Sequence, residues 1–316
     1  MGDVSALKEI ALGARDVPDR LRFLRAAFGL SSERSGFVDP GSAKALWGLD
    51  RPLEAAVAGR ADAPDGPRLR LVAASGAPAR ADGRLSSPGP IGFGVTTRGI
   101  QAVHARIASL GVRFLSPPVR LTPGSLGPTG PVRWETFGQA PDGEFVVLIE
   151  RVNAPQPYGV ISGECATSAP LHASFVVSDL DACSRFMREL LLHETVIRDR
   201  GEGEAFEQVM GTPPGTRFSF EMLQRSGAPA GRIIFIEFER RAEARPETPE
   251  TAPPARGVQA LRYDVGDLDE VLGRVSAAGG RLARGPIMVC SELLGSGRVA
   301  CVHPPFGTLV ELWQPA

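Results

Sequence analysis

Apolar and polar residues alternate in short runs along most of the chain, and helical segments and turns separate these runs. The stretch 171–180, LHASFVVSDL, shows the pattern most clearly, because His172, Ser174 and Val176 alternate with apolar neighbours. Such alternation predicts a strand with one face on a core and the other free to look into a pocket. Asp179 ends the run and is placed to cap a helix.

The same plan of strand, aspartate and helix occurs near the N-terminus. There a strand is predicted to about Gly13, Asp16 is the expected N-cap, and Gly29 is expected to end the helix. Asp16 and Asp179 are 163 residues apart. The chain therefore contains an internal repeat, whose two copies of this first unit we name A (from residue 7) and A′ (from residue 171).

A second kind of unit follows each copy, beginning at residue 91 (unit B) and residue 259 (unit B′). Each runs from a strand through a helix to a closing strand, and the glycines before the closing strands, Gly143 and Gly307, are 164 residues apart. The order is thus A-B-A′-B′, and further strands are predicted at 53–59, 68–74, 217–223 and 232–239.

This pattern predicts an α+β protein in which four βαβββ units pair into two cup-shaped mixed sheets. The expected domains are an N-terminal pair at 1–152, a linker at 153–170 rich in Pro, Gly and Ala, and a C-terminal pair at 171–316. Shorter linkers are expected at 74–90 and 241–257.

Composition narrows the function classes. The 316 residues carry a formal net charge of −1, which gives no field that would gather nucleic acid or an anionic membrane. No apolar run reaches the roughly 18 residues needed to span a bilayer. Four scattered cysteines without a CxxC pair favour reduced thiols over a disulfide framework. We therefore expect a soluble, cytoplasmic protein that acts on a small molecule; a homodimer is compatible with this expectation.

The repeat order, the strand–Asp–helix openings and the closing strands of Pro-Asp-Gly-x-x-hydrophobic-x-Leu style resemble the vicinal oxygen chelate superfamily. That group includes glyoxalase I, the extradiol ring-cleaving dioxygenases and the bleomycin-resistance type binding proteins, and the resemblance extends from about residue 5 to 314. It implies that a divalent metal (Fe, Mn, Zn or Ni) lies on the floor of a cup. The metal would leave positions open for two substrate oxygens.

The resemblance also implies where the metal ligands stand. The positions in the first strands fall at Glu9, Pro90, His172 and Ala260. The glutamate positions in the closing strands fall at Val147 in unit B and Glu311 in unit B′, with Glu237 offered by the last strand of A′. The implied metal ligands are therefore His172 and Glu311 with Glu237, all in the C-terminal pair, and the N-terminal pair is expected to hold no metal.

Arg262 and Asp264 share a strand face with position 260 and are the candidate catalytic residues. Arg262 either binds a substrate carboxylate or enolate beside the metal, or replaces the metal by pairing with Glu311. Trp47, Trp134, Phe137 and Trp313 are candidates for the walls of a ligand site or for ordinary packing.

Two functions remain open at this stage. The first is an enzyme that chelates vicinal oxygens of a small oxygen-rich or aromatic substrate and stabilises an enolate, as a lyase, isomerase or dioxygenase. The second is a metal-free protein that sequesters a metabolite or antibiotic in the same cup.

Overall fold

The computed structural model describes residues 3–75, 84–122, 132–152, 159, 161, 165–239 and 250–316. Each unit contributes an opening strand, a helix and further strands. Unit A comprises β1 (Glu9–Ala14), α1 (Val17–Phe28), β2 (Ser31–Val38), α2 (Pro40–Trp47), β3 (Leu53–Gly59) and β4 (Arg68–Ala73). Unit B comprises β5 (Gly89–Thr96), α3 (Ile100–Ser109), β6 (Arg113–Phe114), β7 (Val119–Leu121), β8 (Arg133–Gln139) and β9 (Phe145–Arg151).

The second half of the chain repeats this order. Unit A′ comprises β10 (His172–Val176), α4 (Leu180–Glu189), β11 (His193–Gly201), α5 (Glu204–Met210), β12 (Phe218–Arg225) and β13 (Arg232–Phe238). Unit B′ comprises β14 (Gly257–Asp264), α6 (Leu268–Arg274), β15 (Arg281–Ser291), β16 (Gly295–His303) and β17 (Leu309–Pro315). The predicted α+β class with four βαβββ-like units is confirmed, and the inserted helices α2 and α5 are additions that the pattern did not predict.

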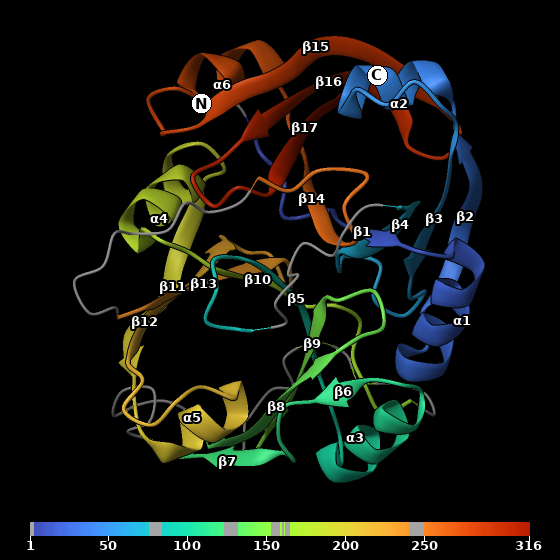
Figure 1. Cartoon of the computed structure of the whole chain (residues 1–316). Coiled ribbons are helices and arrows are strands. Elements are labelled where there is room, and N and C mark those ends of the chain that lie inside the picture. The colour runs from blue at the N-terminus through green and yellow to red at the C-terminus, as the bar shows by residue number, and fades with distance from the viewer. Residues whose placement is uncertain are drawn as a thin grey trace.

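The pairing of the units differs from the prediction. One sheet has the order β15-β16-β17-β14-β1-β4-β3-β2 and so joins unit A to unit B′, and the other, β11-β12-β13-β10-β5-β9-β8-β6, joins unit B to unit A′. In Figure 1 the first and last units share the upper sheet, while the two middle units form the lower one. We name the hollow faces of these sheets the A/B′ cup and the B/A′ cup.

The division into 1–152 and 171–316 therefore does not match the sheets. Each sheet is completed where two opening strands meet antiparallel, β1 with β14 and β10 with β5. An opening strand is the free edge of its own unit, so it can pair with any unit that presents a similar edge. The internal repeat therefore predicts the four opening strands but not which of them pair with one another.

The predicted helix ends are confirmed by the capping contacts. Asp16 accepts a hydrogen bond from the backbone N–H of Asp19, and Asp179 accepts one from that of Ala182. Gly29 ends α1 in the left-handed conformation with φ 67°, which glycine adopts without strain. These local signals fix where each helix begins, and thus the direction of each opening strand.

Three buried clusters define the layers. The largest lies between the convex faces of both sheets and the helices α1, α3, α4 and α6, and joins the two halves into one core. A second cluster fills the A/B′ cup and a third lines the B/A′ cup. Along the central strands, successive side chains therefore point alternately into the shared core and into a cup.

The described residues contain no helix that is both long and apolar enough to cross a membrane. All four cysteines are free thiols, as predicted, with Cys183 and Cys301 buried and Cys290 exposed. Burial raises the pKa of the Cys183 thiol, and the carboxylates of Asp179 and Glu237 raise it further. Such a thiol stays protonated and behaves as a small apolar side chain.

Candidate functional site

His172 and Glu311, the two ligands with the clearest signal in the sequence, lie in different cups. His172 opens β10 and lines a pocket in the B/A′ cup, whereas Glu311 lies within β17 and belongs to the other sheet. The predicted joint site assumed that units A′ and B′ share a sheet. Because they do not, the structure does not bring these two side chains together.

Four charged side chains lie together in the A/B′ cup instead: Glu9, Arg70, Arg262 and Glu311. Arg70 Nη2 donates to Glu311 Oε2 at 2.7 Å, and Arg70 Nη1 lies 3.4 Å from Glu9 Oε2. Arg262 Nη1 lies 3.6 Å from Glu9 Oε1. The side chains of Arg70 and Glu311 are fully buried, so each carboxylate has a guanidinium as its counter-ion away from water.

Two indoles complete the surroundings of Glu311. Trp47 Nε1 donates to Glu311 Oε1 at 2.9 Å, and Trp313 Nε1 donates to Oε2 at 3.4 Å. Trp47 is the last residue of α2, which lies against β15 and packs Ala43 and Leu46 into the cup. This concave face is thus filled by the protein's own side chains, and Trp47 and Trp313 are core residues there.

The guanidinium of Arg70 provides the positive charge that a metal would bring to this floor. Burial by itself would lower the pKa of Arg70, but attraction to Glu311 and Glu9 outweighs burial and raises the pKa above its usual value. A divalent ion between the same carboxylates would displace or repel this guanidinium. The residues of the A/B′ cup therefore do not fit a metal ion.

Arg262 and Asp264, the predicted catalytic residues, contact one another at the edge of this cluster. Arg262 Nε lies 3.3 Å from Asp264 Oδ1, and Nη1 donates to the carbonyl oxygen of Leu294 at 2.6 Å. Its guanidinium carbon lies 4.1 Å from the centre of the Trp313 ring. The sequence offered two roles for Arg262: binding a substrate beside a metal, or replacing the metal by pairing with Glu311. The structure contains an arginine paired with Glu311, but this arginine is Arg70.

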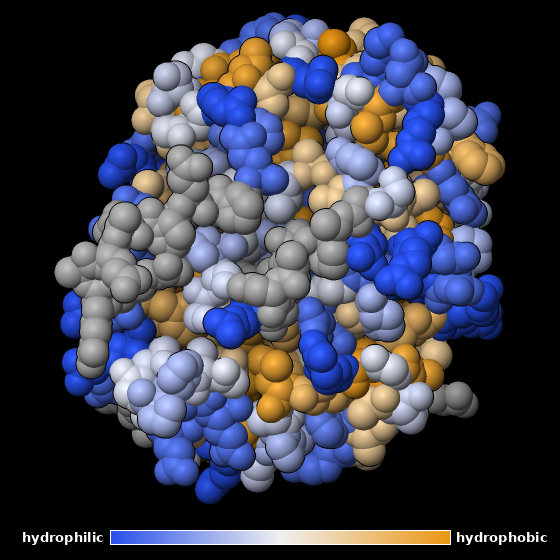
Figure 2. All heavy atoms as spheres, viewed as in Figure 1, coloured by the Kyte–Doolittle hydropathy of each residue, from blue (hydrophilic) through white to orange (hydrophobic). Residues whose placement is uncertain are grey.

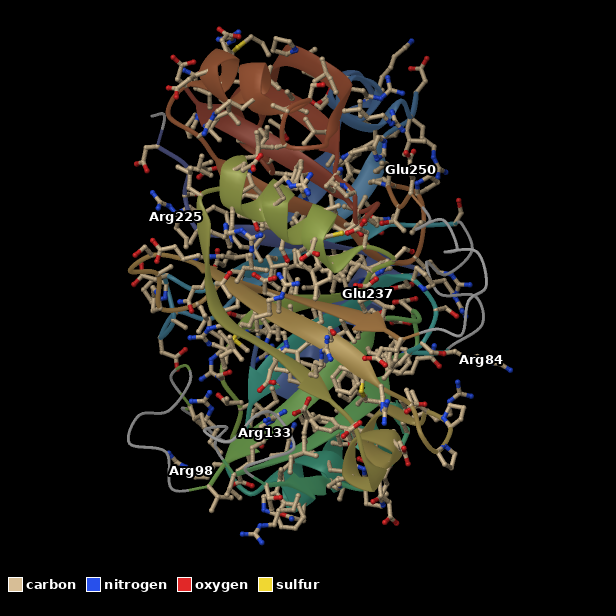
Figure 3. The ribbon with its side chains drawn as sticks, turned by 90° about the vertical axis from the view of Figure 1, so that its left-hand side faces the viewer. Arg84, Arg98, Arg133, Arg225, Glu237 and Glu250 are labelled. Atoms are coloured by element: carbon tan, nitrogen blue, oxygen red, sulfur yellow. The ribbon has the colours of Figure 1, made fainter. Side chains whose placement is uncertain are left out.

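Glu237 lies on the far side of the lower sheet from the pocket. Its Oε2 accepts a hydrogen bond from the backbone N–H of Leu180, the first residue of α4, at 3.3 Å. Ile234 and Ile236 of the same strand face the pocket, and alternation turns Glu237 toward the helix. Figure 3 shows Glu237 on β13 near α4, well separated from the labelled Arg133. Glu237 thus supports a helix N-terminus.

The B/A′ cup, by contrast, contains a pocket with a cavity volume of about 130 Å³. Its walls come from both units of the lower sheet and from α5, and its apolar lining includes Phe137, which the sequence proposed as a wall. Figure 2 shows apolar atoms at the surface in the lower part of this face, in the region where Figure 1 places β8 and β9. Among the described residues, a cluster of buried side chains thus packs into the A/B′ cup, whereas the B/A′ cup contains a pocket.

His172 lies on the floor of this pocket, where two opening strands meet. Its register partner on β5 is Gly94, four positions beyond the predicted Pro90, and its partner on β13 is Arg232. A Cβ atom at Gly94 would overlap the imidazole ring. The glycine thus leaves the space that the ring fills, and Pro90 instead pairs with Phe175.

Burial, together with the positive charge of Arg232, lowers the pKa of His172 from 6.5 to about 3. The ring is therefore neutral at physiological pH, with one nitrogen as a donor and the other as an acceptor. The register position of the closing strand opposite Gly94 is Val147, so the glutamate position of unit B supplies no carboxylate here. Within the described part of the chain, no three His, Cys, Asp or Glu side chains are grouped to hold a metal.

We predict that Gly94→Ala lowers the free energy of unfolding by about 1–3 kcal/mol, because the new methyl group overpacks against the imidazole. The backbone at Gly94 is not in the left-handed region, so alanine adds no backbone strain. The double variant Gly94→Ala/His172→Ala should recover most of the loss in a urea titration. Equal losses in the single and double variants would show that the methyl group clashes with something other than His172.

Neither the protein-family models nor the curated protein sequences match this chain. Solved structures do: glyoxalase I of Zea mays has a TM-score of 0.65 at 16% identity, covering 99% of this chain and 93% of that one. A structure titled as a putative dioxygenase of Bacillus subtilis has a TM-score of 0.57 at 13% identity, covering 99% and 86%. These proteins belong to the vicinal oxygen chelate superfamily, as the sequence patterns predicted.

The fold is thus the glyoxalase-like fold of that superfamily, with four units in one chain. Sequence reasoning missed Arg70, Gly94 and Arg232 as site residues. Gly94 carried a usable signal, since glycine inside a strand often marks a close approach. Arg70 carried none, because its strand alternates arginine with leucine.

Proposed function

We propose that the protein binds a small organic molecule in the pocket of the B/A′ cup and requires no resident metal to do so. The observation that carries this proposal is the pocket itself, an apolar cavity with a neutral histidine on its floor and a valine at the glutamate position of the neighbouring closing strand. Concave apolar sites with a few placed polar groups are the usual form of small-molecule sites. Cavities of about 150 Å³ bind benzene, so a volume of about 130 Å³ suits a single ring.

The superfamily fold supports a small-molecule protein but does not decide between catalysis and binding. The solved structures include glyoxalase I and a putative dioxygenase, yet at 13–16% identity they share only the fold with this chain. The metalloenzyme hypothesis needs His172, Glu311 and Glu237 in one place. His172 lies in the B/A′ cup, Glu311 lies in the A/B′ cup, and Glu237 lies on the helix side of the lower sheet. This separation favours the metal-free alternative.

The protonation behaviour of His172 favours binding over acid–base catalysis. A general base works best with a pKa near the working pH. A pKa of about 3 makes this imidazole a weak base, and it would hold a proton poorly at neutral pH. Its natural role is to exchange one hydrogen bond with a bound molecule on the pocket floor.

A binding experiment on the purified full chain tests this proposal. Benzyl alcohol should bind in ligand-observed NMR, with the same dissociation constant after dialysis against EDTA and after addition of Zn²⁺ or Mn²⁺. Ile234→Trp should abolish binding, because Ile234 lines the pocket and an indole would fill it. Val196→Trp adds the same indole at a position that is 44% exposed and should leave binding unchanged.

Two results would contradict the proposal. Loss of binding with EDTA and its recovery with a divalent ion would assign the pocket to a metal. Equal binding by the wild type and Ile234→Trp would place the bound molecule outside the pocket.

A further inference from the structure

The inserted helices α2 and α5 occupy equivalent places in units A and A′. Each follows the second strand of its unit and contacts strands of the unit that completes its sheet: α2 contacts β15 and β16, and α5 contacts β7 and β8. In Figure 1, α2 lies beside β15 and α5 lies beside β7. Each helix therefore links the two units of one cup.

The two helices also correspond residue by residue at their C-terminal ends. α2 ends at Trp47 and α5 ends at Met210, and each is followed by a glycine in the left-handed conformation, with φ 75° at Gly48 and 62° at Gly211. Counted back from these glycines, the buried positions of one helix match those of the other. The matched pairs are Ala43 with Phe206, Leu46 with Val209, and Trp47 with Met210.

The largest side chain stands at a different position in each helix. In α2 it is the last residue, and the indole of Trp47 reaches β17, where Nε1 donates to Glu311 Oε1 at 2.9 Å. In α5 it is Phe206, one turn earlier, whose ring packs edge-on against that of Phe218 on β12 at a centroid distance of 5.1 Å. The last position of α5 holds the smaller Met210, which lines the pocket.

We infer that Met210 sets the size of the ligand that the B/A′ pocket accepts and limits it to a single ring. Its side chain stands where the corresponding residue of α2 crosses the other cup. This inference rests on the proposed binding function and adds the residue that determines specificity.

Burial and cavity size both support this role. Met210 is 3% exposed and belongs to the cluster that lines the cup, so the length of this side chain decides how far the pocket extends toward α5. The cavity of about 130 Å³ is close to the roughly 150 Å³ that holds benzene, and a second fused ring needs space that the thioether occupies. Apolar pockets discriminate by size, by about 10–200-fold for each methylene that does not fit.

Three substitutions of Met210 test the inference by calorimetry with benzyl alcohol and with naphthylmethanol, which has one more fused ring. Met210→Trp places at the end of α5 the residue that ends α2, and it should weaken the binding of benzyl alcohol at least about tenfold, because the indole fills the pocket. Met210→Ala should bind naphthylmethanol at least about tenfold more tightly than the wild type does. Met210→Leu nearly keeps the side-chain volume and should retain the wild-type order of the two affinities.

Met288→Ala is the matched control, because it makes the same truncation on β15 at a position that is 67% exposed. It should leave the affinities for both probes unchanged. Circular dichroism and the melting temperature establish that each variant is folded before its affinities are compared.

The outcomes separate this inference from the proposed function. If the wild type binds neither probe, both fail. If the wild type binds benzyl alcohol but also binds naphthylmethanol as tightly, the pocket binds small molecules and the size limit is wrong. An affinity for naphthylmethanol that is unchanged in folded Met210→Ala, or that rises equally in Met288→Ala, also overturns the inference. The comparison of the alanine and leucine variants decides even if Met210→Trp does not fold.

Discussion

Arg70→Met is expected to lower the free energy of unfolding by roughly 3–5 kcal/mol, the usual cost of removing one partner from a buried ion pair. Glu311 is fully buried, and among the described residues its carboxylate keeps, without Arg70, the two indole N–H donors of Trp47 and Trp313. Glu9, whose side chain is 6% exposed, loses the guanidinium at 3.4 Å as well. Urea unfolding followed by circular dichroism measures the loss.

Arg68→Met is the matched control on the same strand. Arg68 lies two residues before Arg70 and its Nε is 3.4 Å from Glu33 Oε2, but both side chains are about a third exposed. Ion pairs exposed to this degree contribute about 0–1 kcal/mol, so the control should lose far less than Arg70→Met. Equal losses in the two variants would show that the buried cluster is not what makes Arg70 important.

A second substitution distinguishes lost packing from an uncompensated charge. Arg70→Met/Glu311→Gln removes both charges and keeps the size of the Glu311 side chain. Because an isolated buried charge costs more than a buried neutral amide, the double variant should be more stable than Arg70→Met alone. A double variant that is less stable than the single one would mean that Glu311 stabilises the cup without its counter-ion.

The sequence predicts the content of each unit well, because local rules decide it. Asp16 and Asp179 cap their helices wherever the units are placed, and alternation identifies the opening and closing strands. Which unit pairs with which, by contrast, is decided by tertiary packing. The opening strands of A and A′ carry similar apolar patterns, so no local signal chooses between unit B and unit B′ for either of them.

The candidate site depended on that undetermined choice. His172 and Glu311 were each placed correctly on their strands, but the wrong pairing put them in one cup. Arg70 was missed because its strand, RLRLVAA, alternates arginine with leucine, and the arginine face of such a strand is normally solvated. The carboxylates of Glu9 and Glu311, which pair with Arg70 on that face, come from other strands of the sheet. The sequence of the strand alone therefore does not reveal them.

Phe306→Ala is expected to lower the free energy of unfolding by about 3–5 kcal/mol, as for other buried phenylalanines. Phe306 lies in unit B′ and is fully buried, yet its ring contacts unit A′: its centroid is 5.1 Å from those of Phe175 and Phe235 and 5.9 Å from that of Phe186. It therefore joins the upper sheet to the lower one.

The control for this variant is Phe37→Ala, because Phe37 is 67% exposed and its truncation should change stability by less than about 0.5 kcal/mol. Both variants should still unfold in one cooperative transition, since the largest cluster is shared by both sheets. Separate transitions for the two sheets in Phe306→Ala, or a loss no larger than that of the control, would refute this role. Benzyl alcohol binding by folded Phe306→Ala should be retained, because the pocket lies on the opposite, concave face of the lower sheet.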